Sequence, residues 1–440
     1  GQSGALLPNL ILMFDDSASM AAQFLYRYGG AQGDLGLDGP GSDSLFATCP
    51  RTLSITSTCA YNPPAATQYA QLSPDVNLLA YDPRLTYRPR INADGVTPSS
   101  AGQPSNATFY VYFYRTGMGL NTSWDGRPVR YGSTPSFSVS TGMPDPLLAS
   151  SYFRPQYTPN VDQLANTATP LAYPNAVTDS STRLPKFINR SDCVSSPEYC
   201  TLAEERQNYA NWLKYHSNRL DLAKTGMGLA LQHLGGGLRL GWGRFSSLAK
   251  GQLERGVAML EAANGNAALM PHRISFYNWL YSRSATASDT SSRLALDTVG
   301  RYLMRKDDAG PWSDTPNPAA TATSVSTKPS YIHSACRRNY ALMFTDGYYN
   351  DTLGLYSVGN VDGSAMVTHN GTNTSGNALE FHFNGNAQPY SDAIGDSLAD
   401  VAMKYWLTDL RPDLANRVTP TDAAFDGTLP ANPAFWQNLS

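Results

Sequence analysis

The sequence contains few charged residues and no long apolar run, and both deficits exclude whole classes of protein. Only 15% of the 440 residues are charged and the formal net charge is −3, so the chain has no electrostatic basis for binding nucleic acid or an acidic membrane face. No segment approaches the roughly 20 consecutive apolar residues of a membrane span. Tyrosine, glycine and proline are plentiful instead, a mixture common in secreted and cell-surface proteins.

Cysteine is scarce as well, with five residues in the chain. None forms a C-x-x-C, and no cysteine and histidine cluster has zinc spacing. Cys49 and Cys59 lie in one loop-like region, and Cys193 and Cys200 lie in another, so each pair could close a small ring. We expect two local disulfides in an oxidising compartment, with Cys336 left over. The alternative, scattered reduced thiols in a cytosolic protein, stays open.

Catalytic signatures are missing too. The chain has no G-x-S-x-G, Walker loop or dinucleotide fingerprint, and its six histidines show neither H-x-x-x-H nor H-E-x-x-H spacing. We therefore expect a protein that is not an enzyme. A metal-assisted hydrolase is the least favoured reading, because it needs a general base beside the ion and no histidine lies in the segments described next.

What the sequence does contain is an apolar run that ends in acidic and hydroxyl residues. "NLILMF" (9–14) predicts a short buried strand, and Asp15, Ser17 and Ser19 follow it directly. Strand ends of this kind carry the ligand sites of open α/β folds. A carboxylate and two hydroxyls are hard oxygen donors, which suit Mg²⁺, Mn²⁺ or Ca²⁺ rather than zinc.

Two further segments complete the predicted site. "NYALMF" (339–344) is a second buried strand that runs into Thr345 and Asp346, and Thr290 stands just ahead of a predicted helix over 291–303. Together the site would consist of oxygen donors with only two formal negative charges: Asp15, Ser17, Ser19, Thr290 and Asp346. An ion held mainly by hydroxyls stays electrophilic and favours an acidic group from outside as its last ligand.

Strands and helices alternate along the rest of the chain, which predicts an α/β fold with a mostly parallel sheet flanked by helices. We expect strands over 108–115 and 238–245, and helices over 202–234 and 396–410. The expected organisation is a first strand with its metal loop, a large, partly β, loop-rich insertion, an α/β core, a second insertion, and a C-terminal helix with a tail (1–20, 21–200, 201–350, 351–390 and 391–440).

The spacing of the oxygen donors resembles a known motif. D-x-S-x-S after a first strand, a lone threonine before a helix, and T-D-G after a later strand form the metal-ion-dependent adhesion site of von Willebrand factor A domains. The match here is "DDSAS", Thr290 and "TDG" (345–347). A family residue pattern usually introduces the threonine differently from "ATASDT", so Thr286 and Ser288 stand as possible substitutes for Thr290.

Longer segments are similar to the amino-terminal region of PilC/PilY-type tip adhesins of bacterial type IV pili. They are "RQNYANWLKYHSNRLDLAKTGMGLAL", "CRRNYALMFTDGYYND", "LADVAMKYWLTDLRPDLANRV", "NPAFWQ" and "NLLAYDPRLTYRPRINADG". The resemblance implies a von Willebrand A (Rossmann-like) domain in a protein secreted to the pilus tip. Its implied roles are adhesion, pilus assembly and surface sensing.

The resemblance also implies partners and ligands. Minor pilins of the tip complex would be one partner, and a host or abiotic surface supplying a carboxylate would be the other. Ser17, Ser19 and Thr290 would bind a metal, expected to be Mg²⁺, directly or switchably, and Asp15 and Asp346 directly or through water. The alternative is a structural pilus-priming subunit whose metal site is vestigial or only rigidifying. We expect a removed signal peptide, and a last sheet strand and a β-propeller beyond this chain.

Overall fold

The computed structural model describes about two thirds of the chain, and the statements below concern those residues. The described ranges are 6–22, 74, 77–102, short strand segments between 109 and 165, 183–246, 253–286, 288–319, 332–347, 349–351, 357–361, 367–372, 378–383, 392–418 and 436–439. They fall into two compact units. Unit 1 comprises 1–20, 93–96 and 230–440, and unit 2 comprises 21–92 and 97–229.

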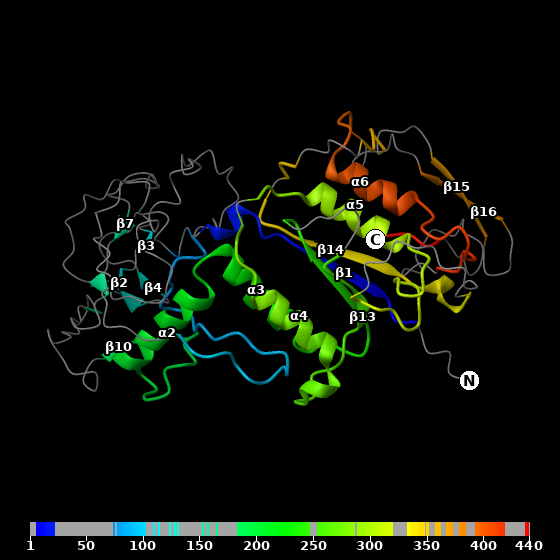
Figure 1. The fold of residues 1–440 in the computed structure, drawn as a ribbon. Coiled ribbons are helices and arrows are strands. Elements are labelled where there is room, and N and C mark those ends of the chain that lie inside the picture. The colour runs from blue at the N-terminus through cyan, green and yellow to red at the C-terminus, as the bar shows by residue number, and fades with distance from the viewer. Residues whose placement is uncertain are drawn as a thin grey trace. The chain divides into compact units, whose positions relative to one another are not determined.

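Unit 1 is built on a four-stranded mixed sheet with the order β13-β12-β1-β14. Strand β1 (Asn9–Phe14) lies between β12 (Arg239–Arg244) and β14 (Asn339–Phe344) and is parallel to both. Strand β13 (Arg255–Met259) pairs with β12 in the antiparallel direction. Figure 1 shows β1 running alongside β14 in the middle of this sheet. The predicted α/β class is confirmed, with a mixed sheet that is compatible with a Rossmann-like fold.

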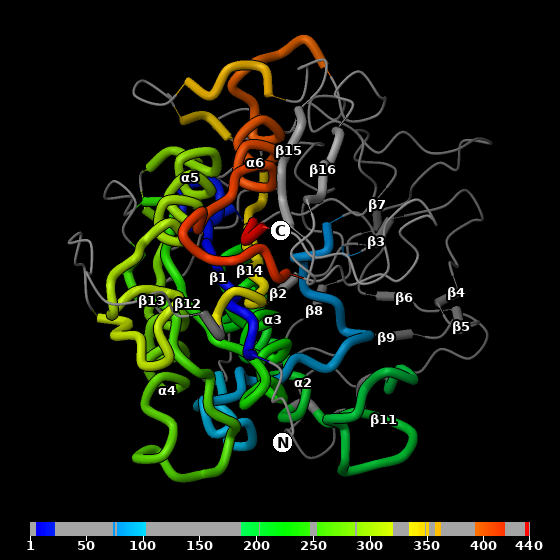
Figure 2. Tube along the Cα trace, turned by 90° about the vertical axis from the view of Figure 1, so that its right-hand side faces the viewer, coloured from blue at the N-terminus to red at the C-terminus, as the bar shows by residue number. Residues whose placement is uncertain are grey.

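Helices cover both faces of this sheet. On one face, Ile11 and Met13 join a buried apolar cluster with residues of α5 (Ser292–Leu303) and α6 (Leu398–Leu407), and both views of the fold show these helices side by side (Figures 1 and 2). On the other face, Trp242 packs edge-on against Phe276 of α4 (Pro271–Tyr281). Because β1 is covered on both faces, its sequence is an unbroken apolar run.

Helices α5 and α6 approach each other closely at Gly300. A Cβ added to Gly300 would lie 2.2 Å from the Tyr405 ring, so only glycine fits this crossing without displacing the ring. The Tyr405 hydroxyl donates to the Asp297 carboxylate at 2.6 Å inside the interface. This contact fixes α5, and therefore the loop before it, against α6.

Unit 2 contains two helices and several short strand pairs. The helices are α2 (Leu202–Tyr215) and α3 (Arg219–Ala230), and β10 (Arg183–Pro185) pairs with β11 (Tyr199–Thr201) just before α2. The remaining pairs in unit 2 are two residues long: β2 (Phe109–Tyr110) with β8 (Gln156–Tyr157), β3 (Phe113–Tyr114) with β7 (Tyr152–Phe153), β4 (Ser123–Trp124) with β5 (Arg127–Pro128), and β6 (Arg130–Tyr131) with β9 (Leu164–Ala165).

Four smaller elements belong to neither the sheet nor these helices. They are the 3₁₀ segments η1 (Ala18–Ala21), η5 (Ala267–Leu269) and η6 (Ile332–Cys336), and an antiparallel pair formed by β15 (Val367–Thr372) and β16 (Ala378–Phe383). The predicted domain boundaries stay a prediction. Among the described residues, no helix is both long and apolar enough to cross a membrane.

Two secondary-structure predictions need correction. The helix predicted over 202–234 is two helices, because the Asn218 side chain accepts from the Asp221 amide at 2.8 Å and starts a new helix there. It also ends earlier, at Ala230. Strand β13 and helix α4 were not predicted. The segment predicted as one strand over 108–115 carries the separate short strands β2 and β3.

Candidate metal site at the ends of two parallel strands

The parallel pairing of β1 and β14 brings their carboxyl ends together. Phe14 lies level with Phe344, and the two rings stack with centroids 5.6 Å apart. The register continues one step further, because the Asp15 amide donates to the Phe344 carbonyl at 2.8 Å. The loops that begin at Asp15 and at Thr345 therefore start side by side.

Four side chains from three loops form a continuous chain of oxygen atoms at this edge. The Thr290 hydroxyl donates to Ser17 Oγ at 3.1 Å, Ser17 Oγ and Ser19 Oγ are 3.1 Å apart, and Ser19 Oγ donates to Asp346 Oδ1 at 2.9 Å. The structure thus gathers the predicted residues from positions up to 327 apart in sequence. The fifth residue, Asp15, lies in the same group through the amide of Ser17.

Asp15 is the buried carboxylate of this group. Its Oδ1 accepts from the Ser17 amide at 2.8 Å and its Oδ2 from the Thr345 hydroxyl at 2.7 Å, and its side chain is fully buried. Burial raises the pKa of the Asp15 carboxyl, and the nearby charge of Asp346 adds to the rise, although the hydrogen bonds oppose it. Negative charge at this position is therefore unfavourable without a compensating positive charge.

The geometry distinguishes Thr290 from its two possible substitutes. The Thr290 hydroxyl joins the oxygen chain, whereas the Thr286 hydroxyl donates to the backbone carbonyl of Asp16 at 3.0 Å and contacts Ser288 Oγ at 2.7 Å. Thr286 and Ser288 therefore fasten their own loop to the loop after β1. The structure places Thr290, and not these two, against the serines.

The donor set fits a hard divalent cation. All five side chains offer oxygen, and two of them are carboxylates, a set that suits Mg²⁺, Mn²⁺ or Ca²⁺. Within the described part of the chain, no three His, Cys, Asp or Glu side chains gather as a metal site would require, so the hydroxyls would have to complete the coordination. Asp15, Ser17 and Thr290 are buried while Ser19 is exposed, which leaves the group accessible from the side of Ser19.

Some residues that shape this edge were not predicted from the sequence. Asp16, next to the predicted ligand Asp15, points elsewhere: its carboxylate accepts from the amide and the hydroxyl of Ser246 at 3.0 and 2.5 Å. Asn350 and Asp351 contact the start of α5 beside Thr290. The only signal for them was their position in "TDGYYND", within a few residues of Asp346.

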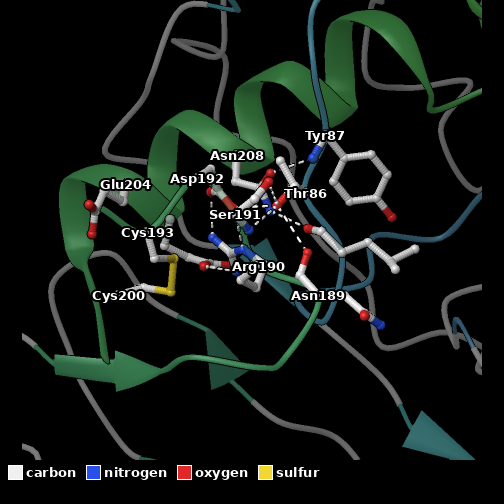
Figure 3. Close-up of polar contacts among 12 residues, drawn as sticks. Thr86, Tyr87, Asn189, Arg190, Ser191, Asp192, Cys193, Cys200, Glu204 and Asn208 are labelled. Atoms are coloured by element: carbon white, nitrogen blue, oxygen red, sulfur yellow. Dashed lines mark hydrogen bonds and ion pairs between the residues drawn. A yellow bond between two sulfur atoms is a disulfide. The ribbon is translucent and has the colours of Figure 1, made fainter. Parts of the chain in front are cut away.

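A second polar cluster lies in unit 2, around Arg190 (Figure 3). Its guanidinium donates from Nη1 to Glu205 at 2.5 Å and from Nε and Nη2 to Asp192 at 2.8 Å each. Tyr81 donates to the other oxygen of Glu205, and the side chains of Arg190 and Glu205 are fully buried. These side chains satisfy one another and hold the segment before β11 against α2.

The cysteine predictions have different outcomes. Cys193 and Cys200 form the predicted disulfide, with Cα atoms 4.9 Å apart, beside the Arg190 cluster (Figure 3). Cys336 is exposed and outside any disulfide of the described residues. Cys49 and Cys59 lie outside the described residues, so their pairing stays a prediction.

Comparison with known proteins gives the wider context. No family model matches the chain, and no solved structure matches it. The type IV pilus biogenesis factor PilY1 of Pseudomonas aeruginosa strain UCBPP-PA14 is 29% identical over 370 residues, which is 79% of this chain and 29% of the relative. The PilY1 of strain PAO1 is 28% identical over 273 residues, or 58% of this chain and 21% of the relative.

These matches support a PilY1-type protein. The resemblance found in the sequence is confirmed at that level. The chain spans less than a third of the length of the curated relatives it matches, so the similarity to PilY1 concerns a part of those proteins.

Proposed function

We propose that this chain is the von Willebrand A-type module of a type IV pilus tip-associated factor, and that it binds a partner through a divalent cation at the oxygen cluster. The observation that carries the proposal is the chain of hydroxyl and carboxylate oxygens from Thr290 through Ser17 and Ser19 to Asp346. The names of the PilY1 relatives support the link to pilus biogenesis. We propose no enzymatic activity.

Each residue has a specific role in this proposal. Ser17, Ser19 and Thr290 offer neutral hydroxyl oxygens to the ion, and Asp15 and Asp346 supply negative charge directly or through water. The ion, expected to be Mg²⁺, would act as a Lewis acid that attracts an anionic oxygen. The amide of Ser17 and the hydroxyl of Thr345 keep the Asp15 carboxylate in one orientation.

The exposure of Ser19 supports binding of a partner from outside. A cation with few anionic ligands of its own keeps a high affinity for another carboxylate. Ser19 is exposed and Asp346 is partly exposed, so an acidic side chain on a host protein, a surface or a pilus subunit could approach from this side. Adhesion and surface sensing would both use this contact.

Isothermal titration of chelator-treated protein with Mg²⁺, Mn²⁺ and Ca²⁺ tests the metal site. We expect saturable binding by the wild-type protein and none by the Asp15→Ala, Asp346→Ala double variant. A Thr286→Ala variant is the matched control, because Thr286 bonds to the backbone of Asp16 and not to the oxygen chain. Absence of binding by the wild-type protein would contradict the proposal.

The structural alternative makes an opposite prediction for cells. The hydrogen bonds from Ser17 to Thr290 and from Ser19 to Asp346 already connect three loops, as a rigidifying role would require. In the full-length protein, an adhesion role predicts that Asp15→Ala abolishes surface attachment while pili still assemble. Loss of pilus assembly, with attachment of the remaining pili unchanged, would favour the priming role instead.

A further inference from the structure

The start of helix α5, next to Thr290, is not capped in the usual way. Ser291 occupies the N-cap position but its side chain makes no capping hydrogen bond. The first amides of a helix have no partner within the helix, so another group has to satisfy them. The capping group here comes from a different loop.

Asp351 supplies that cap from the loop after β14. Its Oδ2 accepts from the amide of Leu294, the third residue of α5, at 3.1 Å, and its Oδ1 accepts from Arg293 Nε at 2.8 Å. Arg293 also donates to the Asp351 carbonyl. A carboxylate at a helix amino terminus is favoured by the helix dipole, so this side chain stabilises α5 while fixing its own loop to it.

Asn350 holds the backbone of Thr290 itself. Its Oδ1 accepts from the Thr290 amide at 2.6 Å, and its own amide donates to the Thr290 carbonyl at 3.2 Å. Two hydrogen bonds to one residue restrict both its position and its rotation. Thr290 therefore cannot shift away from Ser17 without breaking both bonds to Asn350.

We propose that Asn350 is a positioning residue for the metal site, with Asp351 supporting it, and that the pair holds the Thr290 hydroxyl in register with Asp346. This inference rests on the proposed metal binding. Asp346 and Asn350 belong to the same loop, so the loop that supplies one metal ligand also fixes another ligand that lies on a different element. Groups that orient metal ligands in this way typically change metal affinity by about 10- to 100-fold.

The first test needs no metal. In the chelator-treated protein, we expect Asn350→Ala to accelerate hydrogen exchange in the peptide that contains Thr290, while the thermal midpoint stays close to the wild-type value. Asn266→Ala is the matched control, because Asn266 is also an exposed asparagine that accepts from a backbone amide, that of Ala268 at 3.0 Å. It should leave exchange at Thr290 unchanged. Unchanged exchange in Asn350→Ala would overturn the proposal.

The second test is a double-mutant cycle measured by Mn²⁺ titration. Asn350→Ala should weaken Mn²⁺ binding about tenfold in the wild-type background and less than about twofold when Thr290→Val has already removed the hydroxyl. Equal losses in the two backgrounds, or no loss in either, would overturn the positioning role and leave the metal site intact. Absence of Mn²⁺ binding by the wild-type protein would instead overturn the proposed function and this inference with it.

A second variant covers the possibility that Asn350→Ala does not fold. Asp351→Asn keeps an oxygen acceptor for the Leu294 amide and weakens the ion pair with Arg293. We expect it to fold and to weaken Mn²⁺ binding about threefold, at the low end of what supporting groups contribute. Wild-type affinity in Asp351→Asn, with wild-type exchange at Thr290, would overturn the supporting role of Asp351.

Discussion

The two polar clusters of this molecule use similar side chains but differ in what balances their carboxylates. In unit 2, the guanidinium of Arg190 lies between Glu205 and Asp192 and donates to both. In unit 1, the carboxylate of Asp15 receives its hydrogen bonds from two neutral groups, the Ser17 amide and the Thr345 hydroxyl. One cluster has its cation built into the chain, and we propose that the other recruits an exchangeable one.

The difference has a physical consequence for function. A buried ion pair with complete hydrogen bonding is a permanent structural element, since removing either charge leaves the other uncompensated. A cluster of hydroxyls and carboxylates with neutral donors can exist with or without an ion, because its hydroxyl hydrogens can satisfy the neighbouring oxygens when the ion is absent. Only the second kind of cluster can bind and release a ligand through a metal.

The largest expected effect is the loss of the cation in unit 2. Arg190→Met leaves Glu205 buried without its positive partner, so we expect the free energy of unfolding to fall by about 3–5 kcal/mol. Equilibrium urea denaturation, monitored by tryptophan fluorescence, measures this change.

The control is another arginine of the same unit. Arg88 is exposed and donates to Ser191 Oγ at 3.0 Å, so Arg88→Met should cost about 0.5 kcal/mol or less. Equal effects of the two substitutions would show that the buried charge pair has no special weight.

Adding a cation to unit 1 should have the next largest effect. At 100 times its dissociation constant, Mg²⁺ should raise the free energy of unfolding by about 2.7 kcal/mol, and chelator should reverse the change. The Asp15→Ala, Asp346→Ala variant should show no increase. Equal stabilisation of this variant would mean that the ion binds elsewhere. Hydrogen exchange around Arg190 in unit 2 should not respond to the ion.

The sequence predicted the contents of the oxygen cluster better than its surroundings. Apolar runs that end in "DDSAS" and "TDG" identified β1, β14 and their terminal donors, because parallel strands place their carboxyl ends at one edge. Strand β14 has the predicted bounds, and α5 begins one residue after the predicted start. These elements carry strong local signals, namely an apolar period and an abrupt polar end.

Contacts between distant segments had no such signal. The capping of α5 by Asp351, 57 residues from Leu294 in sequence, depends on how two loops meet, which local pattern does not encode. Strand β13 was missed because "RGVAM" contains little apolar alternation. The Arg190 cluster was likewise invisible, since its members come from separate segments whose charges look like solvated surface.

Removing the disulfide should have a smaller effect than removing Arg190. Cys193 follows Asp192 directly, and Cys200 lies seven residues later, just before the N-cap of α2 at Thr201. For a ring of this size, loop-closure entropy predicts a loss of about 2.5 kcal/mol in the Cys193→Ser, Cys200→Ser variant. Denaturation of the wild-type protein under reducing conditions should give the same value. A loss as large as that of Arg190→Met would mean that the ring, and not the ion pair, holds this region.

The smallest expected effect concerns Glu204, a carboxylate that neutral donors do stabilise. Its oxygens accept from the amides of Thr201, Val194 and Ser195 at 2.7 to 2.8 Å. Burial raises the pKa of this partly exposed side chain, but the amide hydrogen bonds outweigh burial and lower the pKa from 4.5 to about 2. Asp15 is fully buried, and there the hydrogen bonds do not suffice and the pKa is raised.

Because the folded-state pKa of Glu204 is depressed, its contribution to stability is present above pH 4.5 and disappears as the pH falls towards 2. Glu204→Gln should therefore lower the free energy of unfolding by about 1 kcal/mol at pH 7 and leave it unchanged near pH 2. Denaturation curves at both pH values measure this difference. An equal loss at both would mean that Glu204 acts through packing, and the contrast with Asp15 would then rest on burial alone.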